Sequence, residues 1–255
     1  MKRVLTAAIL IPPSVWLIYW GPGLAVQAVI ALMAVLCFYE YLGLLKGYGW
    51  DTLGPAGFAA GLVLLLIPQA DLLFVALIAL FLMALSLRAG DVKTVLPQSA
   101  AVLLGVVYIF GAWRCASGLR EISPHWLFFA LVLNWIGDSA AYYFGRAFGK
   151  RKLAPVLSPK KTWEGSAASV VASVLFGVIY LGRFVPETPA WEIVALAGAA
   201  NIAGQIGDLS ESAFKRGAGA KDSGSLLPGH GGWLDRLDSS LFAMPLVYFW
   251  VLRPW

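Results

Sequence analysis

Long apolar runs are the feature that most restricts how this chain can fold. Nine of them, separated by glycine, proline or charge, cover residues 4–20, 24–42, 53–68, 71–87, 98–118, 126–145, 166–183, 190–207 and 237–252. About 20 apolar residues cross a bilayer as a helix, and helices satisfy their own backbone polar groups in lipid. With 60% hydrophobic and 13% charged residues, the 255-residue chain is too apolar for a soluble fold. The sequence therefore predicts an all-α polytopic membrane protein with nine transmembrane helices and almost no β structure.

The basic residues indicate an orientation for these nine segments. If the N-terminus is cytoplasmic, 15 of the 19 lysines and arginines fall on the cytoplasmic side. The four on the outer side are Arg114, Arg120, Arg183 and Arg253. Cytoplasmic loops carry such an excess, so we expect a cytoplasmic N-terminus and an outer C-terminus. The net charge of +5 is then explained by anionic lipid headgroups rather than by nucleic acid.

Polar residues concentrate in the C-terminal half of what we expect to be one integral-membrane domain, residues 1–255. Residues 1–125 are interpreted mainly as helical scaffold. Residues 126–252 form the catalytic half, with two longer cytoplasmic loops at 146–165 and 208–236. The eighth apolar segment is rich in small residues and carries Asn201 and Gln205, which predicts packing inside the bundle and favours a homodimer.

The segment from Asp208 to Asp238 combines three kinds of residue that suit nucleotide phosphates. Its carboxylates are hard oxygen ligands of the kind Mg²⁺ prefers. Its lysines and arginines can neutralise phosphate oxygens, and its six glycines let the backbone approach a ligand closely. Helix capping and solvation would explain any one of these residues, but the combination indicates phosphate chemistry at the cytoplasmic face.

Spacing adds to this interpretation. If the eighth helix continues past Asp208, then Asp208, Glu211, Ser212 and Lys215 share one face. Asp235 and Asp238 are three residues apart at the start of the last segment, so both can face the same side. We also expect the N-terminus of that last helix to help hold a phosphate or pyrophosphate.

Four further residues have both a functional and a structural interpretation. His230 lies in Pro-Gly-His-Gly-Gly, where it can bond a phosphate, donate a proton, or simply bond the backbone of a turn. Asp138 lies inside the sixth segment, and an intramembrane acid is functional by default, with pairing to a loop lysine as the alternative. Lys160 and Lys161 precede the seventh segment, where a lipid phosphate would lie, although simple anchoring is the alternative.

Three stretches resemble the phosphatidate cytidylyltransferase (CDP-diacylglycerol synthase) family. They are SAFKRGAGAKDSGSLLPGHGGWLDRLD at 212–238, NWIGDSAAY at 134–142 and SPKKTWEG at 158–165. The first departs from the family pattern at Trp233, where the family usually has a smaller hydrophobic residue. The resemblance covers residues 130–245, approximately, whereas the N-terminal half matches only in being hydrophobic.

The resemblance implies an enzyme of phospholipid biosynthesis in a bacterial cytoplasmic (inner) membrane. Its substrates would be CTP and phosphatidate, and its products CDP-diacylglycerol and pyrophosphate. The lipid phosphate would attack the α-phosphorus of CTP in line, assisted by Mg²⁺ alone or with a second cation.

Roles follow from that reaction for the residues already singled out. Catalytic roles are expected for Asp208, Asp235, Asp238, Lys221 and His230. The candidate metal ligands, which the sequence does not rank, are Asp208, Asp222, Asp235 and Asp238. The candidate substrate-binding residues are Ser212, Lys215, Arg216, Arg236, Lys160, Lys161, Asp138 and Glu164.

Two other functions are considered. An ion or small-molecule transporter should concentrate its polar residues in broken helices near the bilayer midplane, whereas here they gather in loops at one face. A phosphotransferase that consumes a CDP-activated lipid should carry D-G-x-x-A-R followed by G-x-x-x-D-x-x-x-D, and the chain lacks this pattern.

Overall fold

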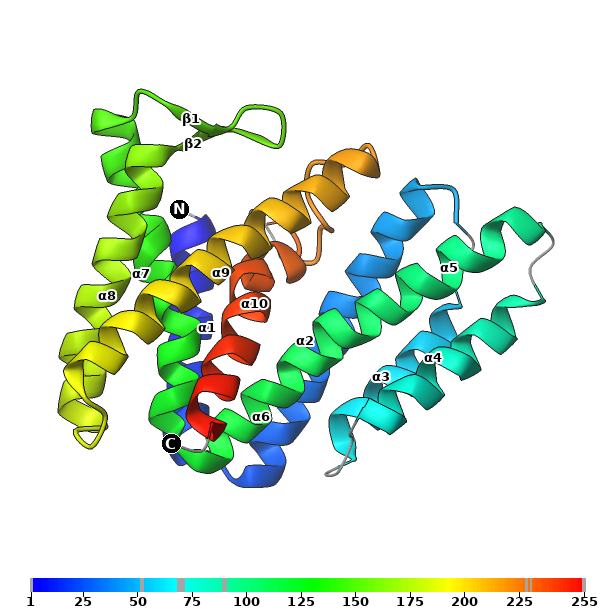
Figure 1. The fold of residues 1–255 in the computed structure, drawn as a ribbon, viewed down its shortest axis with the longest axis horizontal. Helices are drawn as coiled ribbons and strands as arrows, with labels where there is room; N and C mark the ends of the chain where they lie inside the picture. The colour runs from blue at the N-terminus through cyan, green and yellow to red at the C-terminus, as the bar shows by residue number, and fades with distance from the viewer. Residues whose placement is uncertain are drawn as a thin grey trace. The chain divides into compact units, whose positions relative to one another are not determined.

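Helices dominate the computed structural model, which describes residues 2–50, 53–67, 72–88, 91–227, 229 and 231–253 (Figure 1). In chain order the helices are α1 (Lys2–Trp20), α2 (Gly23–Gly47), α3 (Gly54–Leu66), α4 (Leu72–Ser86), α5 (Val92–Gly105), the π-helical η1 (Val106–Gly111), α6 (Ala112–Ile122), α7 (Pro124–Phe148), α8 (Trp163–Phe184), α9 (Ala190–Gly217) and α10 (Leu234–Leu252). Each predicted apolar segment is largely helical, and segment 98–118 runs through α5, η1 and α6 as one continuous helix. The all-α class is therefore confirmed.

Five helices in the described part of the chain are long and apolar enough to cross a membrane. They are α2, the continuous helix from Val92 to Ile122 that includes η1, and α7, α8 and α9. Helices α3 and α4 are equally apolar but have only 13 and 15 residues, and at about 1.5 Å per residue they are shorter than the hydrocarbon core. The protein is thus a helical membrane protein, and the count of nine spans stays a prediction.

Two boundaries differ most from those expected. The fifth helix begins at Val92 rather than at residue 98, because Asp91 caps it by accepting a hydrogen bond from the Lys93 N–H at 2.9 Å. Helix α9 continues to Gly217, so the first ten residues of the predicted loop 208–236 are helical.

The predicted loop 146–165 contains the two strands found in the described residues. β1 (Lys152–Ala154) and β2 (Ser158–Thr162) form an antiparallel hairpin with Ala154 opposite Ser158. Figure 1 shows the hairpin at the adjoining ends of α7 and α8, which pack against each other. Thr162 then begins α8, because its Oγ1 accepts a hydrogen bond from the Gly165 N–H at 3.2 Å.

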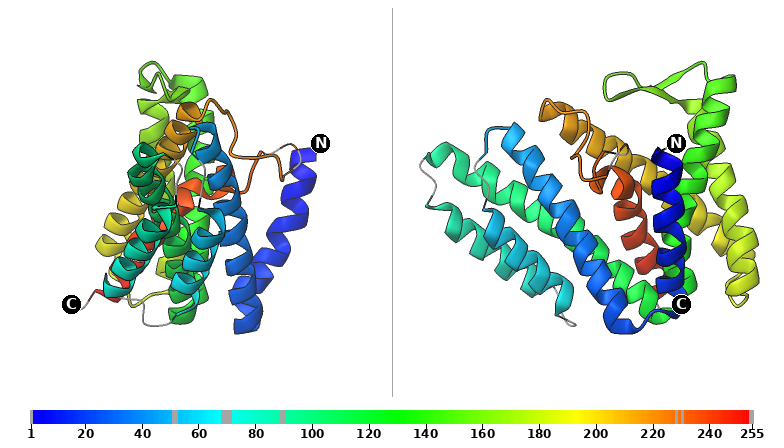
Figure 2. Two further views of the ribbon diagram at one scale, coloured as in Figure 1. Left: turned by 90° about the vertical axis from the view of Figure 1, so that its right-hand side faces the viewer. Right: turned by 180° about the vertical axis from the view of Figure 1, so that it is seen from behind.

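The chain forms two compact units. The first comprises Met1–Ala7, Gly23–Arg114 and Phe214–Arg236, and the second comprises Ala8–Pro22, Cys115–Ala213 and Leu237–Trp255. In the first unit α4 lies alongside α5 (Figure 2). Phe38 of α2 is fully buried there, with its ring 5.2 Å from that of Phe110 and 5.0 Å from that of Phe58. A Cβ at Gly61 would lie 2.2 Å from the Phe110 ring, so only glycine permits this approach of α3 to η1.

The second unit is held by hydrogen bonds between α8 and α9. Asn201 is 1% exposed, and its Nδ2 donates to Ser169 Oγ at 3.1 Å and to Ser173 Oγ at 2.9 Å. Gln205 Nε2 donates to Asn201 Oδ1 at 2.7 Å, and Ser166 Oγ donates to Gln205 Oε1. Small polar residues let membrane helices approach and bond in this way. The predicted inward packing of Asn201 and Gln205 is confirmed.

Candidate functional site

The glycine-rich loop of the first unit begins where α9 ends. Gly217 packs on Tyr48, which directly follows α2, since a Cβ at Gly217 would lie 2.0 Å from the Tyr48 hydroxyl oxygen. That hydroxyl donates to the carbonyl oxygen of Phe214 at 3.0 Å. Gly219 has a φ of 70°, a conformation that glycine adopts without strain. The loop therefore leaves α9 at a turn that is fixed against α2.

Asp235, in the first turn of α10, draws the loop together. Its Oδ1 accepts from Lys215 Nζ at 2.6 Å, and the two side chains are 4% and 12% exposed respectively. Its Oδ2 accepts from the backbone N–H of Ser223 at 2.9 Å and of Gly232 at 2.8 Å. One carboxylate thus joins the end of α9, the middle of the loop and the start of α10.

The pKa of Asp235 reflects a competition between burial and bonding. Burial raises the pKa of this carboxyl, but the hydrogen bonds from Lys215, Gly232 and Ser223 outweigh burial and hold the pKa below its usual value. Asp235 is therefore a carboxylate at neutral pH.

A second carboxylate, Glu40 of α2, binds the same loop and was not among the predicted site residues. It is 3% exposed. Oε1 accepts from the Trp233 N–H at 3.0 Å, and Oε2 accepts from the Leu234 N–H and from Ser223 Oγ, each at 2.9 Å. The sequence signal was present, because Glu40 lies inside the second apolar segment and an intramembrane acid is functional by default.

Glu40 corrects one expectation about the last helix. The first backbone N–H groups of α10 were expected to hold a phosphate, but Glu40 accepts those of Trp233 and Leu234. The Asp235 N–H donates to Ser223 Oγ at 3.3 Å, and the Arg236 N–H donates to the Trp233 carbonyl oxygen at 3.1 Å. The helix N-terminus is thus capped by the protein itself, and the expectation was wrong.

Four charged residues of this unit remain exposed around the anchored loop. They are Arg216, Lys221, Asp222 and Arg236. Gly231 has a φ of 79°, and its carbonyl oxygen accepts from the Leu227 N–H at 2.9 Å, which closes the loop into a narrow turn. His230, predicted to be catalytic, lies outside the described residues.

In the second unit Asp208 of α9 forms an ion pair with Lys161 of β2. Ser212, one turn further along α9, donates to Asp208 Oδ1 at 3.4 Å. Helix α9 continues past Asp208, which is the condition under which the sequence placed Asp208 and Ser212 on one face. Lys160, the neighbour of Lys161, is exposed.

Asp238 lies where α10 meets α9. A Cβ at Gly207 would lie 2.7 Å from the Asp238 carbonyl oxygen and 2.8 Å from the Phe242 ring, so glycine allows the two helices to touch. Asp238 is 8% exposed, and Glu211, one turn beyond Gly207, is fully buried. Three carboxyl-bearing residues, with Asp208, therefore lie around this helix contact.

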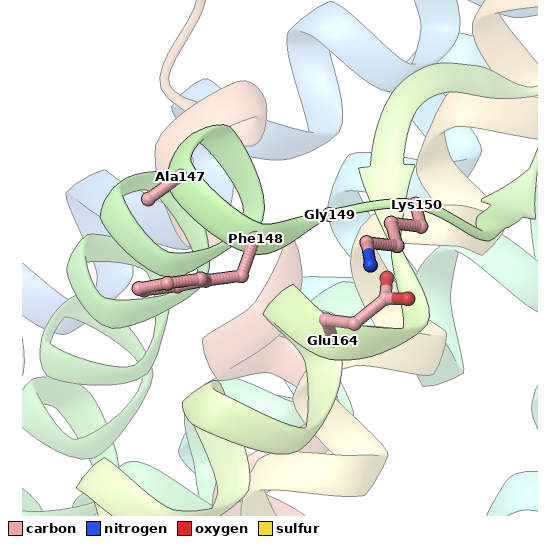
Figure 3. A pocket seen from close by; sticks show the side chains of 5 residues that line it. All are labelled: Ala147, Phe148, Gly149, Lys150 and Glu164. Carbon is pink, nitrogen blue, oxygen red and sulfur yellow. The ribbon is translucent and has the colours of Figure 1, made fainter.

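Glu164 and Asp138 lie elsewhere in the second unit. Glu164, in the first turn of α8, lines an open hollow with Phe148 and Lys150, and Figure 3 shows the side chains of Lys150 and Glu164 pointing toward one another. Both Glu164 oxygens lie 3.3 Å from the Arg151 backbone nitrogen, which donates to them. Asp138, expected deep in a span, lies in α7 with an exposed side chain.

The carboxylates named above suit Mg²⁺, although the described residues do not form a complete protein cage for it. Among the described residues, no three His, Cys, Asp or Glu side chains gather as a metal site. The four expected ligands divide between the units, Asp222 and Asp235 in the first and Asp208 and Asp238 in the second. Mg²⁺ usually takes one or two carboxylates and completes its shell with substrate phosphates and water. Asp208 and Asp238, near the α9–α10 contact in the second unit, are two carboxylates of the kind that such a set needs.

Comparison with known proteins agrees with the residue patterns. The family described as the cytidylyltransferase family matches residues 1–252, which includes the N-terminal half that sequence reasoning left unassigned. A phosphatidate cytidylyltransferase of Staphylococcus saprophyticus is 35% identical over 196 residues, covering 74% of this chain and 75% of that protein.

Two other curated relatives are comparable. A phosphatidate cytidylyltransferase of Staphylococcus aureus is 36% identical over 197 residues, covering 74% of this chain and 75% of that protein. A phosphatidate cytidylyltransferase of Bacillus subtilis is 41% identical over 153 residues, covering 58% of this chain and 56% of that protein. The matched part is therefore between about half and three quarters of these relatives.

Proposed function

Because the chain belongs to the cytidylyltransferase family, we propose that it transfers the cytidylyl group of CTP to phosphatidate. The products are CDP-diacylglycerol and pyrophosphate. The observation that carries this proposal is the glycine-rich loop of the first unit. Asp235 and Glu40 hold its backbone, and three exposed cations and the exposed carboxylate of Asp222 lie around it. The names of the curated relatives support the substrates, and nothing in the comparisons supports a transporter.

The chemistry needs positioning more than it needs a strong base. An oxygen of the phosphatidate phosphate forms a bond to the α-phosphorus of CTP, while the bond from that phosphorus to the β-bridging oxygen breaks and pyrophosphate leaves. The nucleophile is already anionic at neutral pH, so no covalent enzyme intermediate is required. Catalysis then consists of bringing two anions into line and neutralising the charge that develops.

The triphosphate of CTP is assigned to the cations of the loop. Lys221, Arg216 and Arg236 are exposed and can reach phosphate oxygens without breaking a contact within the protein core. Lys215 already binds Asp235, so a phosphate would share its ammonium group with that carboxylate. His230 is assigned to a phosphate or to the leaving group, as its place in the motif suggests.

The divalent cation is assigned to the aspartates. Asp208 and Asp238 are the favoured ligands in the second unit, because Gly207 brings their turns of α9 and α10 together. In the first unit the exposed Asp222 is favoured over Asp235, whose two oxygens already accept three hydrogen bonds. Asp235 then serves mainly to orient the loop and Lys215. When bound, Mg²⁺, alone or with a second cation, neutralises phosphate charge and polarises the α-phosphorus.

The lipid phosphate is assigned to the hairpin end of the second unit. Lys160 is exposed there and Lys161 lies beside Asp208. Glu164 holds the hairpin through the Arg151 N–H, while Asp138 and Ser212 complete the polar surroundings. This cluster lies at the ends of apolar helices α7 and α8, where the acyl chains could remain in the bilayer.

The membrane arrangement belongs to the same proposal. We place the protein in the bacterial inner membrane with nine spans, a cytoplasmic N-terminus and an outer C-terminus, so that both clusters face cytoplasmic CTP. We further propose a homodimer through small-residue helix surfaces, which the mass of the purified protein in detergent would test.

The reaction is tested with purified protein, phosphatidate, radiolabelled CTP and Mg²⁺, by following label into the organic phase. We expect lipid-soluble label only when phosphatidate and Mg²⁺ are both present, and none with EDTA. Asp235→Asn should lower the rate at least about 100-fold, because the loop and Lys215 lose a shared anchor.

Asp91→Asn is the matched control. Asp91 caps α5 away from the loop, and asparagine caps equally well, so its rate should equal that of the wild type. Folded wild-type protein that transfers no label would refute the proposed reaction.

A further inference from the structure

We infer that Glu40 is a positioning residue for cytidylyl transfer, which holds the CTP-binding loop to α2 without touching either substrate. The inference rests on the proposed function, and it concerns a residue that lies outside the three motif stretches. Glu40 lies 183 positions before Ser223 and 194 before Leu234, yet it contacts both. No other acidic side chain in the described residues of α2 is available for this contact.

The bonding of Glu40 is directed entirely at the loop. Its two oxygens accept three hydrogen bonds of 2.9–3.0 Å, from the N–H groups of Trp233 and Leu234 and from the hydroxyl of Ser223. A carboxylate accepts and does not donate, so it matches these three donors. The positive end of α10 also favours a negative charge at this point. The cost of burying an acid in an apolar helix is offset by contacts with the loop.

Two loop glycines leave room for this carboxylate because they carry no side chain. A Cβ at Gly224 would lie 2.7 Å from Glu40 Oε1, and a Cβ at Gly232 would lie 2.2 Å from Glu40 Oε2. The loop backbone therefore wraps closely around the Glu40 side chain. These glycines are therefore needed for the close approach of the loop to a protein carboxylate.

Ser223 connects Glu40 to Asp235. Its hydroxyl donates to Glu40 and accepts from the Asp235 N–H, while its own N–H donates to Asp235 Oδ2. Because Asp235 in turn holds Lys215, displacement of Glu40 would be transmitted through Ser223 to the charged residues. Glu40 is 3% exposed, so it acts through these neighbours and not on the substrate.

The test replaces Glu40 by glutamine, which keeps the size of the side chain and presents an NH₂ donor to one of the N–H groups. We expect kcat/KM for CTP to fall about 10- to 100-fold, as for a small displacement of reacting groups. The KM for phosphatidate should change little, since the lipid is assigned to residues of the second unit. Tyr41→Phe is the control, because it removes the neighbouring buried bond from α2 to Ala101 without touching the loop.

A double-mutant cycle with Ser223→Ala separates positioning from general destabilisation. If Glu40 acts through Ser223, the effects of Glu40→Gln and Ser223→Ala on kcat/KM should be clearly less than additive. Additive effects, or a Glu40→Gln enzyme with wild-type kinetics, would overturn the inference.

Limited proteolysis gives a readout that does not depend on catalysis. Trypsin should cut after Lys221 faster in folded Glu40→Gln protein than in wild type or Tyr41→Phe, because the loop is released from α2. Equal cleavage rates would overturn the inference even if the wild type transfers no label. If the wild type is inactive but the Glu40→Gln protein is still cleaved faster than the wild type, only the proposed reaction is refuted.

Discussion

At the scale of single residues, two buried carboxylates perform different tasks on one loop. Asp235 binds a lysine and two backbone N–H groups, whereas Glu40 binds two N–H groups and a hydroxyl. Asp235 is therefore linked to a residue that can reach phosphate, whereas Glu40 is linked only to the loop and to the start of α10. Because of this difference, we expect the bonds of Asp235 to respond to ligands and to pH. Glu40 instead holds the loop in position.

The bonds of Asp235 predict how stability depends on pH. Its folded pKa lies below the ordinary value, so it stabilises the protein above the unfolded pKa of about 3.9. That contribution is lost as the pH falls through the lower, folded pKa. We expect Asp235→Asn to cost about 3 kcal/mol near pH 7, as for a buried pair that loses one partner.

The measurement compares thermal unfolding of both proteins in detergent from pH 7 to pH 3. The difference in midpoint should be constant down to about pH 5 and should shrink below about pH 4. A difference that grows as the pH falls would contradict the assignment of Asp235 as a bonded carboxylate.

At the scale of elements, the approach of α9 to α10 decides where Asp208 and Asp238 lie. Gly207 lies on α9 against the Asp238 backbone of α10. A backbone oxygen cannot move aside as a flexible side chain can. The two carboxyl-bearing turns therefore stay adjacent only while this position lacks a Cβ.

Gly207→Ala should separate the helices and lower transfer activity about 10-fold or more, because reacting groups held by the two turns lose alignment. The Mg²⁺ concentration that gives half-maximal activity should also rise. Gly198→Ala is the matched control on the same helix, since a Cβ there would meet only Val174 at 3.8 Å. Equal activity and equal Mg²⁺ dependence of both variants would show that this helix contact does not position the metal ligands.

At the scale of the whole molecule, the two units are interleaved along the chain. Helices α9 and α10 each begin in one unit and end in the other. Between them they carry Asp208, Ser212, Lys215, Asp235 and Asp238. The membrane orientation of these two helices therefore decides on which side of the bilayer these five residues lie.

Cysteine labelling in cells can test that orientation. Val156→Cys in the hairpin and Ser225→Cys in the loop should react with a membrane-impermeant maleimide only after lysis, while Glu187→Cys between α8 and α9 should react in intact cells whose outer membrane has been made permeable. All three positions are exposed. The native thiols Cys37 and Cys115 would first be replaced. Labelling of Ser225→Cys from outside would contradict the cytoplasmic site.

Several features could be predicted because their causes are local. Apolar runs identified the helices, because helical hydrophobicity is a local property of the chain. The run ended ten residues before α9 does, and the shared face of Asp208 and Ser212 followed only on the condition that the helix continued. The concentration of acids, bases and glycines identified the loop, because phosphate chemistry requires those residue types within a short segment. Composition alone determined that the protein is a helical membrane protein.

The tertiary structure alone decided which charges meet. Nothing in the order of residues paired Lys161 with Asp208, or brought Glu40 to Leu234 across 194 positions. It also decided that the start of α10 is capped by Glu40 instead of being open to phosphate. Local propensity acts over a few residues, whereas these pairings depend on how helices pack and on which N–H groups burial leaves in need of an acceptor.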